Sequence, residues 1–158
     1  MTMAPLLRRL VFAFLLLGMM PASAQKPLEQ IVQGMAQVDF FAFGGVGFAG
    51  TTSEGEMGFR TVMSEPPDRA LALFETLYAT GNLQAKGYAL VGIRALKPAR
   101  FKELYKALLT SKDNITTMRG CIVSSEHFSD IVRQIDKGNY DVWLRPKPFA
   151  FTPGLFSS

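Results

Sequence analysis

Residues that carry several common kinds of chemistry are scarce in this sequence. Its 158 residues include one cysteine, Cys121, and one histidine, His127. A single cysteine excludes an internal disulfide, and a single histidine excludes metal sites built from several histidines. Core packing must therefore stabilise the domain, and His127 is the only histidine available as a general base. We expect neither a metal ion nor a cofactor to be bound.

Long apolar runs are also lacking, apart from a short one near the N-terminus. Two arginines at positions 8 and 9 precede an apolar stretch over 10–20, and Pro21-Ala22-Ser23-Ala24-Gln25 then matches the Ala-x-Ala pattern of signal-peptidase cleavage. This stretch is too short to span a bilayer, which takes about 20 residues. We interpret residues 1–24 as a cleaved signal peptide and expect an exported protein without a membrane span.

Removal of the signal peptide leaves residues 25–158, a length that suits a single domain because domains commonly hold about 100 to 150 residues. The two arginines are lost with the signal peptide, so the product has 15 basic and 13 acidic residues. A net charge of about +2 gives no support for nucleic-acid binding. Because small secreted domains often depend on disulfides, the single cysteine favours a bacterial periplasm over a eukaryotic secretory route, and we expect a periplasmic or secreted bacterial protein.

The spacing of apolar residues predicts a small, mostly helical α+β domain. Helices are expected to begin at Leu28, to span 54–64, to run from Asp68 to Gly81, to span 83–96, to follow Pro98 as far as Leu109, and to run from Ser125 to Gly138. The helix over 83–96 is apolar nearly all round, so it should be the most buried. The short linkers predict antiparallel packing, and β-branched residues over 115–124 predict one strand or a bent hairpin.

Capping residues mark several of the predicted helix ends. Ser53 and Glu56 form a capping box, in which each side chain satisfies a backbone N–H at the start of a helix. Asn82 is expected to cap the helix over 83–96. Gly81 is expected to end the preceding helix in the left-handed conformation.

The segment 67–111 consists of predicted helices of about thirteen residues, separated by Gly81-Asn82 and Lys97-Pro98. In this spacing it resembles a HEAT-type α-solenoid repeat, a family whose members mostly bind other proteins. The resemblance implies a protein-binding helical stack, and it assigns a role to no individual residue.

The glycine-rich segment 45–50 reads Gly-Val-Gly-Phe-Ala-Gly and matches the G-x-G-x-x-G pattern of dinucleotide sites. A dinucleotide fold needs a second parallel strand that ends in an acidic residue about 20 positions later, whereas Pro66, Pro67 and another helix follow here. The segment also approximates a phosphate-binding loop, but Thr51 stands where that loop needs a lysine. The pattern therefore favours a tight turn packed beside phenylalanines.

Cys121 and His127 form the sharpest catalytic hypothesis that the residues permit. Cys121 lies in the apolar run 120–123, a context that favours a buried structural thiol. A reactive thiol needs an activating base, and His127 follows six residues later. His127 also has serines and carboxylates as neighbours, but residues this close along a helix start rarely point at one centre. The alternative interpretation of His127 is a surface residue beside a helix cap.

The C-terminal segment 139–158 alternates prolines with aromatic residues and is predicted to be extended. Four of its residues combine aromatic rings with positive charge and are candidates for contact with a partner: Trp143, Arg145, Lys147 and Phe149. The alternative is that this arm lies across its own domain and covers a sheet edge or a helix seam.

No cluster of ionisable groups has the pattern of an active site. The sequence therefore favours an exported, non-catalytic protein that binds another protein. Two alternatives remain open. One is a small thiol-dependent hydrolase or transferase that uses Cys121 and His127, and the other is an envelope assembly or scaffolding factor that acts through its helices.

Overall fold

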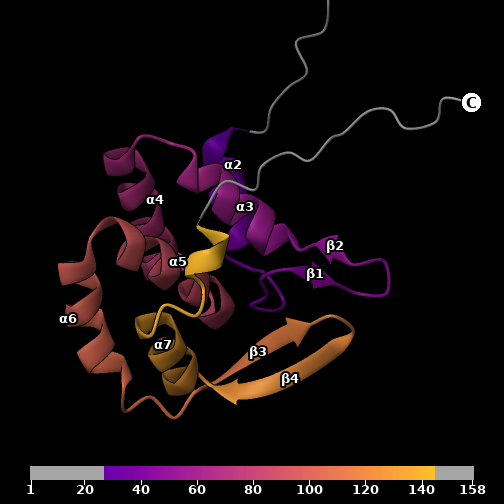
Figure 1. Ribbon diagram of the computed structural model, residues 1–158. Coiled ribbons are helices and arrows are strands. Elements are labelled where there is room, and N and C mark those ends of the chain that lie inside the picture. Colours follow the sequence, from indigo (N-terminus) through magenta and orange to yellow (C-terminus); the bar gives the residue numbers. More distant parts are fainter. Residues whose placement is uncertain (1–26, 145–158) are drawn as a thin grey trace, which may run out of the picture.

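The structure, a computed structural model, describes residues 27–144 (Figure 1). Within this range the α-helices are α2 (Leu28–Met35), α3 (Glu54–Met63), α4 (Pro67–Thr80), α5 (Leu83–Leu96), α6 (Pro98–Leu108) and α7 (Phe128–Asp136). The strands are β1 (Gly45–Val46), β2 (Thr51–Thr52), β3 (Asn114–Arg119) and β4 (Ile122–His127), and a 3₁₀ turn, η1, covers Asp141–Trp143. The predicted mostly helical α+β fold is confirmed.

Helix α5 lies at the centre of the helical layer and packs against α3, α4, α6 and α7. Its Tyr88, Leu90 and Ile93 are fully buried, which confirms the prediction that this helix is the most buried. Each large apolar side chain buried in this way contributes about 1.5 to 3 kcal/mol. A glycine in α5 also allows close packing, because a Cβ at Gly92 would lie 2.7 Å from Cζ of Phe74.

The helix caps are confirmed in part. Asn82 accepts a hydrogen bond from the backbone N–H of Ala85 at 2.9 Å, as predicted. Gly81 is extended, with φ −81° and ψ 161°, so the prediction of a left-handed C-cap is wrong. Close packing requires a glycine at this position instead. A Cβ at Gly81 would lie 2.6 Å from Cβ of Ala85 and 2.7 Å from the carbonyl oxygen of Leu77.

The second hairpin is longer than the sequence predicted. Strands β3 and β4 pair antiparallel along six residues each, and Gly120 turns the chain with φ +57°. Ser125 lies within β4 opposite Thr116, so its predicted role as the cap of α7 is wrong, and His127 occupies that position. Pairing with β3 overrides the weak strand propensity of Ser124 and Ser125. Gly138, with φ +80°, ends the last helix as predicted.

The chain from Phe41 through β1 to Gly47 pairs with the inner side of this hairpin. The N–H of Phe41 donates to the carbonyl of Thr116 at 2.8 Å, and the N–H of Gly47 donates to the carbonyl of Gly120 at 2.9 Å. Residues 41–47 therefore run beside β3, while β4 lies on the other side of β3 at the outer edge. Figure 1 shows both hairpins projecting from the same side of the helices. Within residues 27–144, no helix combines the length and hydrophobicity that a membrane crossing needs.

Candidate functional site

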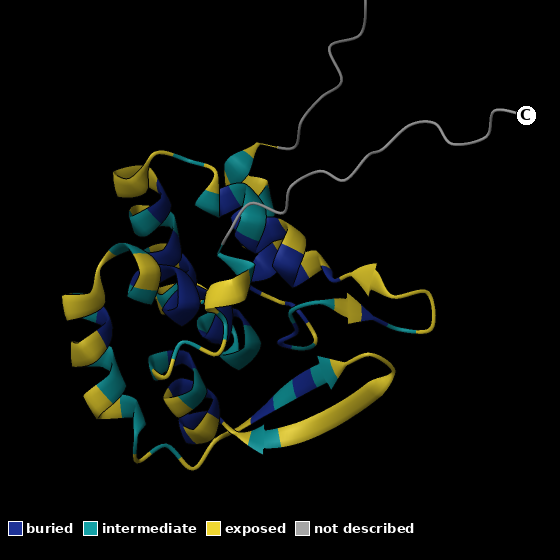
Figure 2. Ribbon diagram, in the orientation of Figure 1, coloured by how far each residue is buried: buried dark blue, intermediate teal, exposed yellow. Residues whose placement is uncertain are grey.

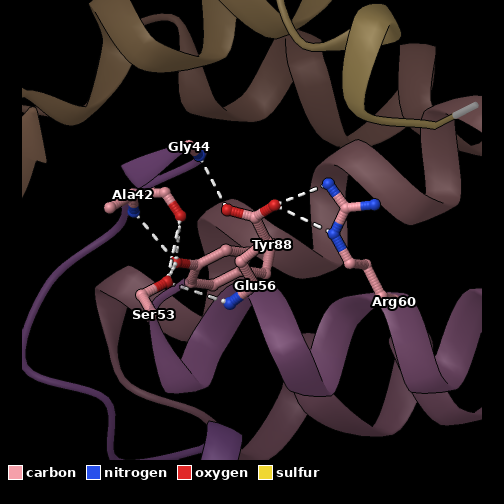
Figure 3. Close-up of polar contacts among 6 residues, drawn as sticks. All are labelled: Ala42, Gly44, Ser53, Glu56, Arg60 and Tyr88. Atoms are coloured by element: carbon pink, nitrogen blue, oxygen red, sulfur yellow. Dashed lines mark hydrogen bonds and ion pairs between the residues drawn. The ribbon is translucent and has the colours of Figure 1, made fainter. Parts of the chain in front are cut away.

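A buried tyrosine anchors the segment that precedes the first hairpin (Figure 3). The hydroxyl of Tyr88 donates to the carbonyl of Ala42 at 2.6 Å, accepts from the N–H of Ala42 at 2.9 Å and lies 3.2 Å from the hydroxyl oxygen of Ser53. Burial raises the pKa of Tyr88 above its ordinary value, although the bonds to Ser53 and Ala42 oppose that change. The neutral hydroxyl therefore ties residues 41–43 to the central helix.

A buried carboxylate anchors the next part of the same segment. Glu56 is 1% exposed, and its Oε1 accepts two hydrogen bonds from Arg60, at 2.9 and 2.6 Å, while Oε2 accepts from the N–H of Gly44 at 2.7 Å. The N–H of Glu56 donates to the hydroxyl of Ser53, so one half of the predicted capping box is confirmed. The side chain of Glu56 turns to Gly44 and Arg60 instead of the N-cap, and the local sequence pattern gave no sign of that longer-range role (Figure 3).

A cleft of about 250 Å³ opens between this anchored segment, β3, α7 and η1. One wall is aromatic and consists of Phe41, Phe43, Tyr140 and Trp143. The rings pack against one another, with centroids 5.2 Å apart for Phe41 and Tyr140 and 6.2 Å apart for the stacked pair of Phe43 and Trp143. Packing of this kind holds the wall in one arrangement.

Four polar residues make up most of the remaining lining: Thr117, Arg119, Gln134 and Asn139. Three of them donate hydrogen bonds to Glu126, which is not itself part of the lining. Glu126 accepts hydrogen bonds from Thr117 at 2.7 Å, from Arg119 at 3.5 Å and from Nε2 of Gln134 at 3.5 Å. The hydroxyl of Tyr140 donates to Oε1 of Gln134 at 3.2 Å. Burial raises the pKa of Tyr140 to about 12, which nearby Arg119 opposes and Glu126 reinforces. Tyr140 is therefore a neutral hydrogen-bond donor throughout the physiological range.

Strand β4 is exposed along most of its length, whereas β3 is partly buried (Figure 2). Ile122 and Val123 are 70% and 60% exposed. The carbonyl of Thr116 accepts a hydrogen bond from Phe41 and therefore points away from β4. Because backbone groups alternate in direction along a strand, the odd-numbered residues of β3 direct their N–H and C=O groups at β4. The same alternation along β4 directs the N–H and C=O groups of Val123 and Ser125 outward, where the described residues place no neighbouring strand.

The structure separates the two residues of the catalytic hypothesis. Cys121 lies in the turn of the hairpin and His127 lies at the far end of β4, so about 20 Å of extended chain stands between them. Cys121 is exposed, and the prediction of a buried thiol is therefore wrong. The apolar residues around Cys121 belong to a hairpin end that extends beyond the helices and do not enter the core. His127 is an exposed helix cap, as its alternative interpretation held.

The glycine-rich segment folds as a hairpin. β1 and β2 pair antiparallel around a turn in which Gly47 and Gly50 have φ of +69° and +60°. The prediction of a tight turn is confirmed, and the strand-to-helix geometry of a dinucleotide loop is absent from this segment. Phe48 at the turn is fully exposed instead of packed, because the turn projects away from the helices.

Trp143 is the one candidate contact residue of the C-terminal segment that the structure describes. Its indole stacks on Phe43, and the guanidinium carbon of Arg60 lies 6.0 Å from the centre of its ring. Trp143 thus packs on its own domain. The prediction of an extended chain is wrong over Asp141–Trp143, where η1 forms beside α5 with Arg94 paired to Asp141. Arg145, Lys147 and Phe149 lie outside the described residues.

Comparisons with other proteins give the chain no relatives. No protein-family model matches it, and no curated protein sequence or solved structure is significantly similar to it.

Proposed function

We propose that this chain is an exported, non-catalytic module that binds an extended segment of a partner protein along the outer edge of β4. The observation that carries the proposal is the outward direction of the backbone groups of Val123 and Ser125. An exposed strand edge pairs readily with another extended chain, which supplies main-chain hydrogen bonds. Proteins that avoid such pairing usually place proline or a charged residue such as lysine at the edge, and β4 has neither over 122–125.

Exposed apolar side chains accompany this edge. Five large hydrophobic residues are exposed in the described part of the chain, and Phe48, Ile122 and Val123 account for three of them. They lie on two hairpin ends that are joined by the hydrogen bond from Gly47 to Gly120. Apolar groups gathered beside a strand edge favour a partner segment that carries apolar side chains of its own.

The alternatives from the sequence make different demands. A thiol-dependent hydrolase or transferase would need Cys121 beside His127, and the extended β4 that lies between them argues against that pair. An assembly or scaffolding factor would use the HEAT-like helices of residues 67–111 in place of β4. The site at which a partner binds therefore distinguishes these functions.

Site-specific photocrosslinking in the source cells tests the proposal. A photoreactive amino acid at position 123 or 125 should crosslink one defined partner, whereas the same residue at Lys106, an exposed position on α6, should not. A partner captured at Lys106 alone would support the scaffolding function and contradict binding at β4. Mass spectrometry of the purified protein tests export separately, because cleavage after Ala24 leaves Gln25 as the first residue.

A further inference from the structure

We propose that the cleft between residues 41–43, β3, α7 and η1 binds a neutral, hydroxyl-rich ligand of about the size of a monosaccharide unit. This site lies on the inner side of β3 and does not depend on binding at β4. Its volume of about 250 Å³ is slightly below the range of about 300 to 1,000 Å³ found for pockets that hold drug-sized ligands. The space therefore suits one sugar ring of a longer chain.

The charge of the lining favours a neutral ligand. Arg119 is the one ionised residue that lines the cleft in the described part of the chain, and its guanidinium pairs with Glu126 at 3.5 Å. An anion would have to compete with Glu126 for Arg119 and would lie close to the carboxylate. A ligand without charge incurs no such repulsion.

The polar groups of the lining include both donors and acceptors. The amides of Gln134 and Asn139 each combine N–H groups with a carbonyl oxygen, and Thr117 adds a hydroxyl oxygen. Sugar hydroxyls both donate and accept, so they match this mixture better than a purely anionic or purely apolar molecule does. Tyr140 and Trp143, two residues of the aromatic wall, pack against the C–H groups of the sugar ring.

The cleft is held in shape before any ligand arrives. The backbone that carries Phe41 and Phe43 is held by hydrogen bonds of Tyr88 with Ala42 and of Glu56 with Gly44. These bonds reduce the ordering that binding would otherwise require. Neither Tyr88 nor Glu56 lines the cleft, so both act on it through the backbone of Ala42 and Gly44.

Fluorescence of Trp143 provides a direct test, since it is the only tryptophan in the chain. We expect at least one of the neutral trisaccharides N,N′,N″-triacetylchitotriose, maltotriose and cellotriose to shift the emission, with a dissociation constant below about 10 mM. Absence of any shift or heat of binding at that concentration with all three would overturn the proposal. An equal response to glutarate or inorganic phosphate would also overturn it, because the cleft would then accept anions.

Matched variants locate the binding. Gln134→Met removes an amide from the lining at nearly constant volume and should weaken sugar binding about tenfold, since ligand hydroxyls lose their partners. Gln33→Met makes the same change on the exposed face of α2 and should leave affinity within about twofold. Asn139→Ala, at an exposed position of the lining, should weaken binding even where the Gln134 variant folds poorly. Unchanged affinity in both cleft variants would place the sugar elsewhere.

Discussion

Tyr88 and Ala42 are 46 residues apart in the sequence, yet the hydroxyl of Tyr88 bonds both backbone groups of Ala42. Tyr88→Phe would leave the buried N–H and C=O of Ala42 without that partner, at a cost of about 1 to 3 kcal/mol. We expect urea denaturation to show a loss of this size. Tyr78→Phe on α4, where the ring is partly exposed, is the control and should cost less than about 0.5 kcal/mol. Equal losses in both variants would mean that the Tyr88 hydroxyl adds nothing specific.

Gly55 provides an independent test of the same contact. A Cβ at this position would lie 2.6 Å from Cζ and 2.7 Å from the hydroxyl oxygen of Tyr88. Gly55→Ala should therefore destabilise the fold by about 1 to 3 kcal/mol, because the ring must shift. Gly34→Ala in α2 meets no atom within 4 Å and should stabilise the fold by about 0.5 kcal/mol through helix propensity. Thermal unfolding of the two variants should give Tm changes of opposite sign, and a stable Gly55 variant would contradict the packing.

Sequence patterns predicted the parts of the fold that depend on near neighbours. Helix α5 has apolar residues on nearly every side, and the caps at Ser53 and Asn82 act on residues three positions away. Strand β4 depends instead on pairing with β3, because Ser124 and Ser125 have little strand preference of their own. The local pattern at Ser125 therefore predicted the start of a helix where the end of strand β4 lies.

The candidate sites were beyond what spacing alone could predict. The cleft joins residues 41–43, 117–119 and 134–143, which lie far apart in the chain and share no motif. One signal was available in retrospect: Tyr88 has the only polar-tipped side chain in the run 87–93 of helix α5, and a buried tyrosine hydroxyl usually has a partner. Nothing in the sequence indicated that this partner is the backbone of Ala42.

Tyr140 predicts a stability change at high pH. Its pKa is raised to about 12 in the folded protein, against 10.0 as the ordinary value. The stabilisation is fully present below about pH 10 and is lost as pH rises toward 12, because the unfolded chain gives up its proton first. We expect this residue to contribute about 1 to 2 kcal/mol to the loss. Comparison of urea denaturation at pH 9 and 11.5 in the wild type and Tyr140→Phe isolates its share from those of Tyr78 and Tyr88.

Cys121 should react as an exposed thiol that is independent of His127. Because it lies in the hairpin turn, iodoacetamide should label it in the folded protein without denaturant. His127→Gln should change the labelling rate less than about twofold, since about 20 Å of strand separates the two residues. The rate can be followed by mass spectrometry at several pH values. A tenfold slower reaction in the His127 variant would revive a catalytic pair.

The outer edge of β4 is tested by the contrast between Ser125→Pro and Ser125→Ala. Proline removes the outward N–H of residue 125, which β3 does not use, and proline is tolerated in edge strands for that reason. With the partner identified by crosslinking, Ser125→Pro should weaken binding at least about tenfold, because a main-chain hydrogen bond is lost and the ring blocks the edge. Ser125→Ala retains the N–H and should bind within about twofold of the wild type. Similar Tm values for the two variants would show that the fold is kept. Equal binding by both would mean that the partner does not add a strand to β4, and the search would move to the exposed side chains of Phe48 and Ile122.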